Sequence, residues 1–447
     1  MADGVIGRSL SKWTPGQILV STFALLILIG SLLLSLPMAS RGQPVPYVNA
    51  LFTATSAVCV TGLAVVDTAT QFTWFGQLVI LALIQLGGLG LMTMATMMAV
   101  LLGRKISFRN RLIMQESLNQ FSLGGILRLT MAVGVVTGFF EALGAIMLTA
   151  RFLPQYGWPV SLWYGIFHSA SAFCNAGFDL IGRFQSLTPY VSDWLINLVI
   201  TILIIFGGLG FSVVADIYNH RRNLNRLSLH SKIVLSFSFF LIVTGTLSLL
   251  LVDWNGALAE LPVTSKVAGA YFQAVTTRTA GYFTIPLESF RPAGILLMIL
   301  LMFIGASPGS TGGGVKTTTI AALVLGVVST VKGREDAQIF DRRIPREIVQ
   351  RASAIASIAF ALVLLVTVTL SLTEQQPFLS LLFEAVSAFA TVGLSLGITP
   401  QLSLVGRIII MLTMFIGRVG PMTLALALVR PEGYTGVRYP EEKIIVG

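Results

Sequence analysis

Charged residues are scarce in this sequence. Only 11% of its 447 residues are Asp, Glu, Lys or Arg, against roughly 25% in soluble domains. Hydrophobic residues make up 55% of the chain, and the mean hydropathy is +0.84. This shortage of charge excludes an ordinary soluble protein and indicates an integral membrane protein. The first long apolar run exceeds the length of a signal peptide, so we interpret it as a retained span.

The sequence also has few of the residues that metal binding or catalysis would need. Its two cysteines, Cys59 and Cys174, each lie three residues before a glycine, and no CxxC motif or Cys/His cluster accompanies them. They predict small side chains that pack a tight turn, rather than a disulfide or a metal site. No nucleophile or acid/base constellation is present either. We therefore expect no enzyme activity.

Positive charge dominates among the few charged residues, and its placement predicts a topology. The net charge is +10, and twenty of the 29 Lys and Arg lie in the two termini and in three segments, 104–128, 221–232 and 332–351. Cytoplasmic segments of membrane proteins carry such an excess. The asymmetry therefore predicts cytoplasmic termini, and it argues against nucleic-acid binding as the reason for the charge.

Apolar stretches long enough to cross about 30 Å of hydrocarbon alternate with shorter ones. The long stretches lie at 16–36, 75–102, 126–150, 193–216, 232–252, 292–325, 354–373 and 403–429. The short ones lie at 48–58, 163–174, 267–277 and 379–390, and a glycine turn follows each. Non-helical backbone at membrane depth must face protein or water. The pattern predicts four repeats of helix, re-entrant loop and helix, with bounds 1–108, 109–230, 231–346 and 347–447.

The four turns align on one glycine each, and three of them carry Ser-Ala at the same upstream positions. Glycine adopts positive φ without a Cβ penalty, and backbone carbonyls can replace the hydration shell of a cation. We predict that each glycine, as the main cation ligand, forms a selectivity filter with the two residues before it. The filter residues are Val60, Thr61, Gly62, Asn175, Ala176, Gly177, Thr279, Ala280, Gly281, Thr391, Val392 and Gly393.

A glycine-rich stretch interrupts the second long helix of the third repeat. Interior glycine costs about 1 kcal/mol and proline about 3 kcal/mol in a helix, so we predict a broken helix with an intramembrane loop. The spacing superficially resembles a P-loop, but Val315 displaces the lysine by one residue and no βαβ pattern surrounds it. The stretch comprises Gly305, Ala306, Ser307, Pro308, Gly309, Ser310, Thr311, Gly312, Gly313 and Gly314.

Glycines at the same level of the first two repeats, starting at Gly87 and Gly207, predict only close helix packing. Lys316 and Arg418 lie deep in apolar sequence, where a charge normally faces a cavity or a partner.

Four further polar residues lie near the turns or in the spans. Arg278 in the third turn should face away from a cation path, and we expect it to pair with Glu384. Glu141 and His168 are interpreted as buried hydrogen-bonding groups.

These turns and repeats resemble the Trk/Ktr/HKT superfamily of potassium transporters over nearly the whole chain. The resemblance places the family's four filter glycines at Gly62, Gly177, Gly281 and Gly393. It implies an all-α membrane protein with eight spanning helices and four re-entrant pore helices around a central pore. The absence of two extra helices before the first repeat favours the ion-translocating membrane subunit of a bacterial Ktr-type system.

The resemblance implies potassium uptake across the bacterial plasma (inner) membrane, with potassium as the substrate and sodium as a candidate activator. The stretch 305–314, with Lys316 and Arg418, would form a gate beneath the filter. The implied partners are a second copy of the chain, with 444–446 as a candidate interface, and a cytoplasmic ring of nucleotide-binding regulatory subunits. The basic pairs at 221–222 and 342–343 are candidate docking sites. The chain itself is expected to bind no nucleotide.

Two other transport mechanisms remain open. One is an alternating-access symporter that couples a cation to protons or sodium; such proteins usually contain inverted repeats, whereas these repeats are predicted to be parallel. The other is sodium permeation, which plant relatives with serine in place of the first filter glycine accept. Gly62 favours potassium.

Overall fold

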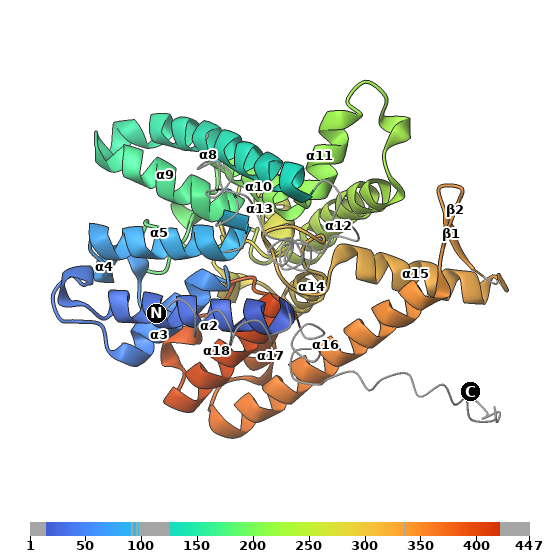
Figure 1. The fold of residues 1–447 in the computed structure, drawn as a ribbon. Helices are drawn as coiled ribbons and strands as arrows, with labels where there is room; N and C mark the ends of the chain where they lie inside the picture. Colours follow the sequence, from blue (N-terminus) through green and yellow to red (C-terminus); the bar gives the residue numbers. More distant parts are fainter. Residues whose placement is uncertain (1–14, 91–92, 95–96, 98–125, 335, 421–447) are drawn as a thin grey trace, which may run out of the picture.

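Four long apolar helices, one from each repeat, form the outside of the molecule (Figure 1). The computed structural model describes residues 15–90, 93–94, 97, 126–334 and 336–420. The long helices are α2 (Pro15–Leu34), α8 (Ile126–Tyr156), α12 (Leu229–Asp253) and α16 (Arg346–Thr373). All four are long and apolar enough to cross a membrane. Large side chains on their outer faces are exposed, among them Leu251 at 82% and Leu372 at 83%, so these faces suit lipid.

Each long helix is followed by a shorter helix that begins directly after a proline. The short helices are α3 (Tyr47–Val58), α9 (Val160–Phe173), α13 (Val263–Thr276) and α17 (Phe378–Phe389). Their N-cap residues are Pro46, Pro159, Pro262 and Pro377. Proline has a φ suited to a helix start and lacks an N–H, so it marks these boundaries. At 12 to 14 residues and 1.5 Å per residue, none spans a bilayer.

The third helix of each repeat ends at a glycine-rich level inside the molecule. These helices are α5 (Trp74–Leu89), α10 (Trp194–Gly208), α14 (Pro292–Phe303) and α18 (Leu404–Val419). The residues that follow α5 and α18, Gly90 and Gly420, have φ of 81° and 92°. After α10 the chain turns by 95° at Gly210 into α11 (Phe211–Asn219). After α14 it forms the loop 304–316 before α15 (Thr317–Val331).

The break after α10 corrects the expectation for the second repeat. The apolar stretch 193–216 was predicted as one span, but the chain turns at Gly210, whose φ is 92°. The all-α membrane fold is confirmed, and the described residues contain four helices that could span alone and one bent pair. Residues 104–125, both termini and the candidate interface at 444–446 lie outside the described residues.

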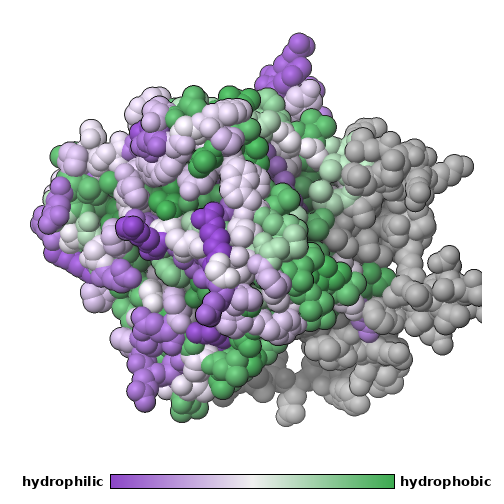
Figure 2. All heavy atoms as spheres, turned by 90° about the vertical axis from the view of Figure 1, so that its left-hand side faces the viewer, coloured by the Kyte–Doolittle hydropathy of each residue, from purple (hydrophilic) through white to green (hydrophobic). Residues whose placement is uncertain are grey.

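Small elements connect the helices at both ends of the bundle. They include α4 (Thr68–Gln71) and the 3-10 turns η1 (Pro37–Ala39), η2 (Thr188–Tyr190), η3 (Leu224–Arg226), η4 (Leu287–Ser289) and η5 (Thr399–Gln401). An antiparallel hairpin, β1 (Ala337–Ile339) with β2 (Arg342–Ile344), projects beyond α15 (Figure 1). Figure 2 shows the opposite side, near α4, where hydrophilic side chains cover much of the surface.

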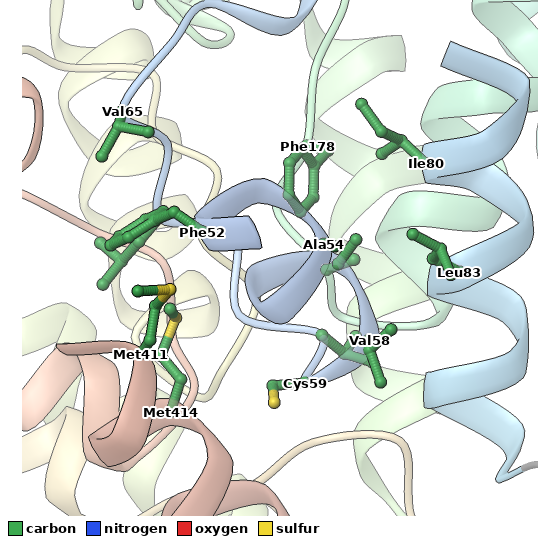
Figure 3. Close-up of a cluster of buried hydrophobic side chains, with 14 of the residues drawn as sticks. Phe52, Ala54, Val58, Cys59, Val65, Ile80, Leu83, Phe178, Met411 and Met414 are labelled. Carbon is green, nitrogen blue, oxygen red and sulfur yellow. The ribbon is translucent and has the colours of Figure 1, made fainter. Parts of the chain in front are cut away.

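The buried core joins repeats that are far apart in the sequence. Phe178, which follows the second glycine turn, packs beside Ala54 of α3 (Figure 3). Met411 and Met414 of α18 belong to the same cluster. Because the pore helices and the turns pack together at the centre, the glycines that follow them are brought to one place.

Candidate functional site: a ring of four glycine turns

Three of the four pore helices end in the same backbone motif. At the end of α3, the Val60 N–H donates to Ala57 O (3.1 Å) and the Thr61 N–H donates to Ser56 O (2.8 Å). Val60 has φ of 56°. This is a Schellman cap, which usually places glycine at the left-handed position. The same bonds recur after α9 and α17, with Asn175 and Thr391 at positive φ.

A valine or threonine at positive φ is strained, because its branched Cβ crowds the backbone. Such strain costs of order 1–3 kcal/mol and persists only where the surroundings enforce it, often at functional sites. The turns are therefore held by the fold rather than by local preference.

The third turn departs from the other three at the helix end. α13 ends at Thr276, five residues before Gly281, whereas the other pore helices end four residues before their glycines. The Ala280 N–H donates to Thr276 O (2.9 Å). Thr279 nevertheless has positive φ (73°), two residues before the glycine, as in the other turns. The backbone pattern near the glycine is therefore common to all four repeats.

The four glycines form a closed ring. A Cβ atom added to each glycine would meet the backbone of the next turn, so the neighbours of such an atom show the order of the ring. A Cβ on Gly62 would lie 2.5 Å from Ala176 O, and one on Gly177 would lie 2.8 Å from Ala280 O. On Gly281 the same atom would lie 2.6 Å from Val392 O, and on Gly393 it would overlap Thr61 O. Each glycine thus abuts the carbonyl that precedes the next glycine. Since real Cβ atoms stay beyond 3.0 Å, the ring has room for no side chain.

Hydroxyl groups from the pore helices hold the turns in place. Ser56 Oγ accepts from the Gly62 N–H (3.0 Å), and Ser387 Oγ accepts from the Gly393 N–H (3.1 Å). In the other two repeats the hydroxyl donates to the carbonyl after the glycine: Ser171 Oγ to Phe178 O (2.8 Å) and Thr276 Oγ1 to Tyr282 O (2.6 Å). The serine of the repeated Ser-Ala pattern therefore positions the turn.

The ring suits a cation that oxygen atoms coordinate. The C-terminal ends of all four pore helices, which carry partial negative charge, meet the turns. Thr61 Oγ1 and Thr391 Oγ1 are buried and have no hydrogen-bond partner among the described residues. Oxygen-rich turns of this kind can replace the hydration shell of an ion. The described residues contain no group of three or more His, Cys, Asp or Glu that could hold a metal.

The loop 304–316 folds back on itself and fastens to the second repeat. The Gly305 N–H donates to Val315 O (2.9 Å). Thr311 Oγ1 donates to Phe173 O at the end of α9 (3.2 Å). Further backbone bonds join Ser307 N to Gly208 O (3.0 Å) and Phe211 N to Gly309 O (2.9 Å). The loop therefore packs into the break after α10.

The same loop lies directly against two of the filter turns. A Cβ on Gly312 would overlap Thr279 Oγ1, and one on Gly313 would overlap Thr391 Oγ1. Both threonines lie two residues before a ring glycine. The structure therefore brings the candidate gate into contact with the candidate filter.

Two half-buried cations fix the loop through carbonyl groups. Lys316 Nζ donates to Gly312 O (2.8 Å). The Arg418 guanidinium donates to Thr311 O in the loop and to Gly87 O and Gly88 O in the first repeat. No carboxylate among the described residues forms an ion pair with either side chain. Arg418 therefore joins the loop to the far side of the ring.

The predicted pair of Arg278 and Glu384 is wrong. Arg278 Nη2 donates to Ser238 Oγ on α12 (2.9 Å), whereas Glu384 Oε1 accepts from Thr399 Oγ1 (2.5 Å). The two side chains do not meet because Arg278 points to α12, the first helix of its own repeat, whereas Glu384 lies within α17 and contacts Thr399. Arg278 does avoid the ring, as expected.

The interpretation of Glu141 and His168 as hydrogen-bonding groups is confirmed. Glu141 Oε2 accepts from Gln85 Nε2 (2.7 Å), and His168 Nε2 accepts from the Leu180 N–H (3.2 Å). Both cysteines are buried and free. Three glycines of α5, α10 and α18, namely Gly87, Gly207 and Gly417, allow these helices to approach the last carbonyl of their own repeat's pore helix closely.

Comparisons with known proteins agree with this architecture. A family model described as "TrkH: Cation transport protein" matches residues 10–434. The Ktr system potassium uptake protein B of Bacillus subtilis is 42% identical over 98% of this chain and 97% of its own length. The potassium/sodium uptake protein NtpJ of Enterococcus hirae is 39% identical, with 98% and 99% covered.

The crystal structure of the potassium transporter TrkH from Vibrio parahaemolyticus has the same fold. It aligns with a TM-score of 0.72 at 18% identity and covers 93% of this chain and 84% of that one. A cation transport protein is not an enzyme, as the sequence indicated. The chain belongs to the TrkH family of cation transport proteins.

Proposed function

We propose that this chain takes up potassium through a pore whose selectivity filter is the ring of four glycine turns. The closed ring carries the proposal, because each glycine abuts the carbonyl before the next one and no side chain can enter. The choice of ion rests on the relatives, which are named for potassium uptake or for potassium and sodium uptake. The division into four repeats at residues 108, 230 and 346 belongs to the same proposal.

The loop 304–316, with Lys316 and Arg418, acts as the gate in this proposal. Its contacts with Thr279 and Thr391 support this role, since a segment seated there obstructs the path of an ion below the ring. The carbonyl contacts of Arg418 stabilise the closed position. A positive charge beneath the ring also opposes cation flow, which favours a controlled pore over an open one.

The proposal places the chain in a bacterial plasma membrane with both termini in the cytoplasm, as a homodimer. The relatives of the Ktr system support a separate regulatory subunit, which we propose is a cytoplasmic nucleotide-binding ring. The β1–β2 hairpin is a candidate contact, because Arg342 and Arg343 form its second strand. Sodium as an activator remains a prediction.

Influx into proteoliposomes tests the function. Vesicles with the purified chain should take up rubidium, a potassium analogue, at least about tenfold faster than sodium, which corresponds to about 1.4 kcal/mol. Sodium influx that equals rubidium influx would contradict the choice of ion. Transport that is strictly coupled to a proton or sodium gradient would instead support the symporter alternative. Repeating the assay with and without sodium tests its activating role.

Charge reversal tests the docking site. Arg342→Glu should abolish co-purification of the regulatory subunit while leaving basal influx unchanged, because the hairpin lies beyond the end of α15 and away from the ring. Lys332→Glu, at the end of α15 but outside the hairpin, is the control. Equal loss of binding in both variants would argue against the hairpin as the specific contact.

A further inference from the structure

Two buried polar side chains occupy the same position in alternate repeats. His168 lies nine residues before Gly177 on α9, and Glu384 lies nine residues before Gly393 on α17. Both are fully buried. Both also contact the segment that follows their glycine. The proposed filter assigns no role to these contacts.

His168 holds the segment after the second turn. Its Nδ1 lies 2.8 Å from Tyr164 O, and its Nε2 lies 3.2 Å from Leu180 N, three residues beyond Gly177. A carbonyl only accepts and a backbone N–H only donates, so the ring is neutral with its proton on Nδ1. Aromatic rings of Phe152, Tyr164 and Phe167 surround it. The imidazole is therefore fixed as an acceptor for Leu180.

Glu384 holds the corresponding segment of the fourth repeat. Its Oε1 accepts from Thr399 Oγ1 at 2.5 Å, and Thr399 Oγ1 lies 2.9 Å from Ser395 Oγ. Ser395 lies two residues after Gly393, so the carboxyl group and the two hydroxyls tie the pore helix to the segment that follows the glycine. Glu384 Oε2 is buried and has no hydrogen-bond partner among the described residues.

The other two repeats lack this contact. At the equivalent position, Thr53 Oγ1 donates within its own helix to Asn49 O (2.9 Å), and the third repeat has the apolar Phe272. Opposite members of the ring are therefore held by a buried acceptor, and the two between them are not.

We infer that His168 and Glu384 are positioning residues for ion selectivity, which hold the segments after Gly177 and Gly393 so that the ring keeps its shape around the larger ion. The inference rests on the proposed function. Discrimination between potassium and sodium depends on the size and stiffness of the carbonyl cage or on its field strength. Either property changes if the segments that follow these glycines are released.

Substitution in matched pairs tests the inference by the ratio of rubidium to sodium influx into proteoliposomes. His168→Leu and Glu384→Leu remove the acceptor, and we expect each to lower the ratio about tenfold, as expected for one unsatisfied buried donor. His168→Gln and Glu384→Gln keep an acceptor oxygen and should stay within about twofold of the wild type. Thr53→Val, at the same position of the first repeat, should leave the ratio unchanged.

A more conservative pair of substitutions tests the inference if the leucine variants do not fold. Thr399→Val keeps the shape but removes the hydroxyl that donates to Glu384, whereas Thr399→Ser keeps the hydroxyl. The valine variant should lose selectivity about tenfold, and the serine variant should retain it. A wild-type ratio in Thr399→Val, or equal losses in valine and serine, would overturn the inference for the fourth repeat.

The outcome is separable from that of the proposed function. If Gly393→Ala loses influx while the leucine and valine variants keep the wild-type ratio, the ring is the filter and the positioning role is wrong. If Gly393→Ala transports normally, the proposed function itself fails.

Discussion

Replacing Gly393 by alanine is expected to lower rubidium influx at least about a hundredfold, equivalent to about 2.7 kcal/mol. Two costs combine at this position. Its φ of 93° is a conformation that alanine adopts poorly. In addition, the new Cβ would overlap Thr61 O, so the carbonyl of the neighbouring repeat must move. Influx into proteoliposomes at equal protein content measures the effect.

Gly42→Ala is the matched control for this substitution. Gly42 also has positive φ (89°), but a Cβ there would meet nothing within 4 Å. The control therefore carries the backbone strain without the intrusion into the ring, and it should retain at least half of the influx. If both variants lose influx equally, the effect arises from misfolding and not from the filter.

Deleting Ala306 to Gly314 is expected to raise influx about tenfold and to weaken its dependence on the regulatory subunit; a tenfold change corresponds to about 1.4 kcal/mol. The deletion removes the segment that lies against Thr279 and Thr391. The ring keeps its own hydroxyl contacts, which come from the pore helices. Influx with and without the regulatory subunit measures both effects. Unchanged influx in the deletion variant would indicate that the loop has only a structural role.

A point substitution isolates the contribution of the arginine to the same gate. Arg418→Gln removes the guanidinium that joins Thr311 O to Gly87 O and Gly88 O, so it should raise influx in the same direction as the deletion. Arg407→Gln lies on the same helix, but its side chain bonds to Asn49 and Pro400, away from the loop. An equal rise in both variants would indicate loosening of α18 rather than opening of the gate.

The sequence predicted the parts of the site that repeat. The four glycines, the short segments before them and the interrupted helix near Gly305 were visible because each carries a local signal, either a turn residue in register or a cluster of helix-breaking residues. Three of the four pore-helix starts could also have been marked, since Pro46, Pro262 and Pro377 directly precede short apolar segments.

The breaks after α5 and α10 were not predictable in the same way. A Gly-Gly pair permits both close helix packing and a turn with positive φ, and only the tertiary structure decides between them. At Gly210 the decision depends on the loop 304–316, whose backbone bonds to Gly208 and Phe211 occupy the gap.

Side-chain partners were the least predictable part. Opposite charge suggested Arg278 with Glu384, but the register of each helix turns the two apart, and uncharged hydroxyls serve both. The order of the four turns around the ring could not be predicted from the sequence either, because the contact between Gly393 and Thr61 joins segments that are far apart in the chain. Such closure is a property of the assembled fold.

The position of a bound ion tests the central claim most directly. Thallium or rubidium scatters anomalously, so diffraction from crystals grown in either ion locates it without reference to function. The account predicts a peak on the axis between Gly62, Gly177, Gly281 and Gly393, and its loss on soaking with sodium alone. An ion bound elsewhere in the pore, with the ring empty in a protein that still transports rubidium, would contradict it.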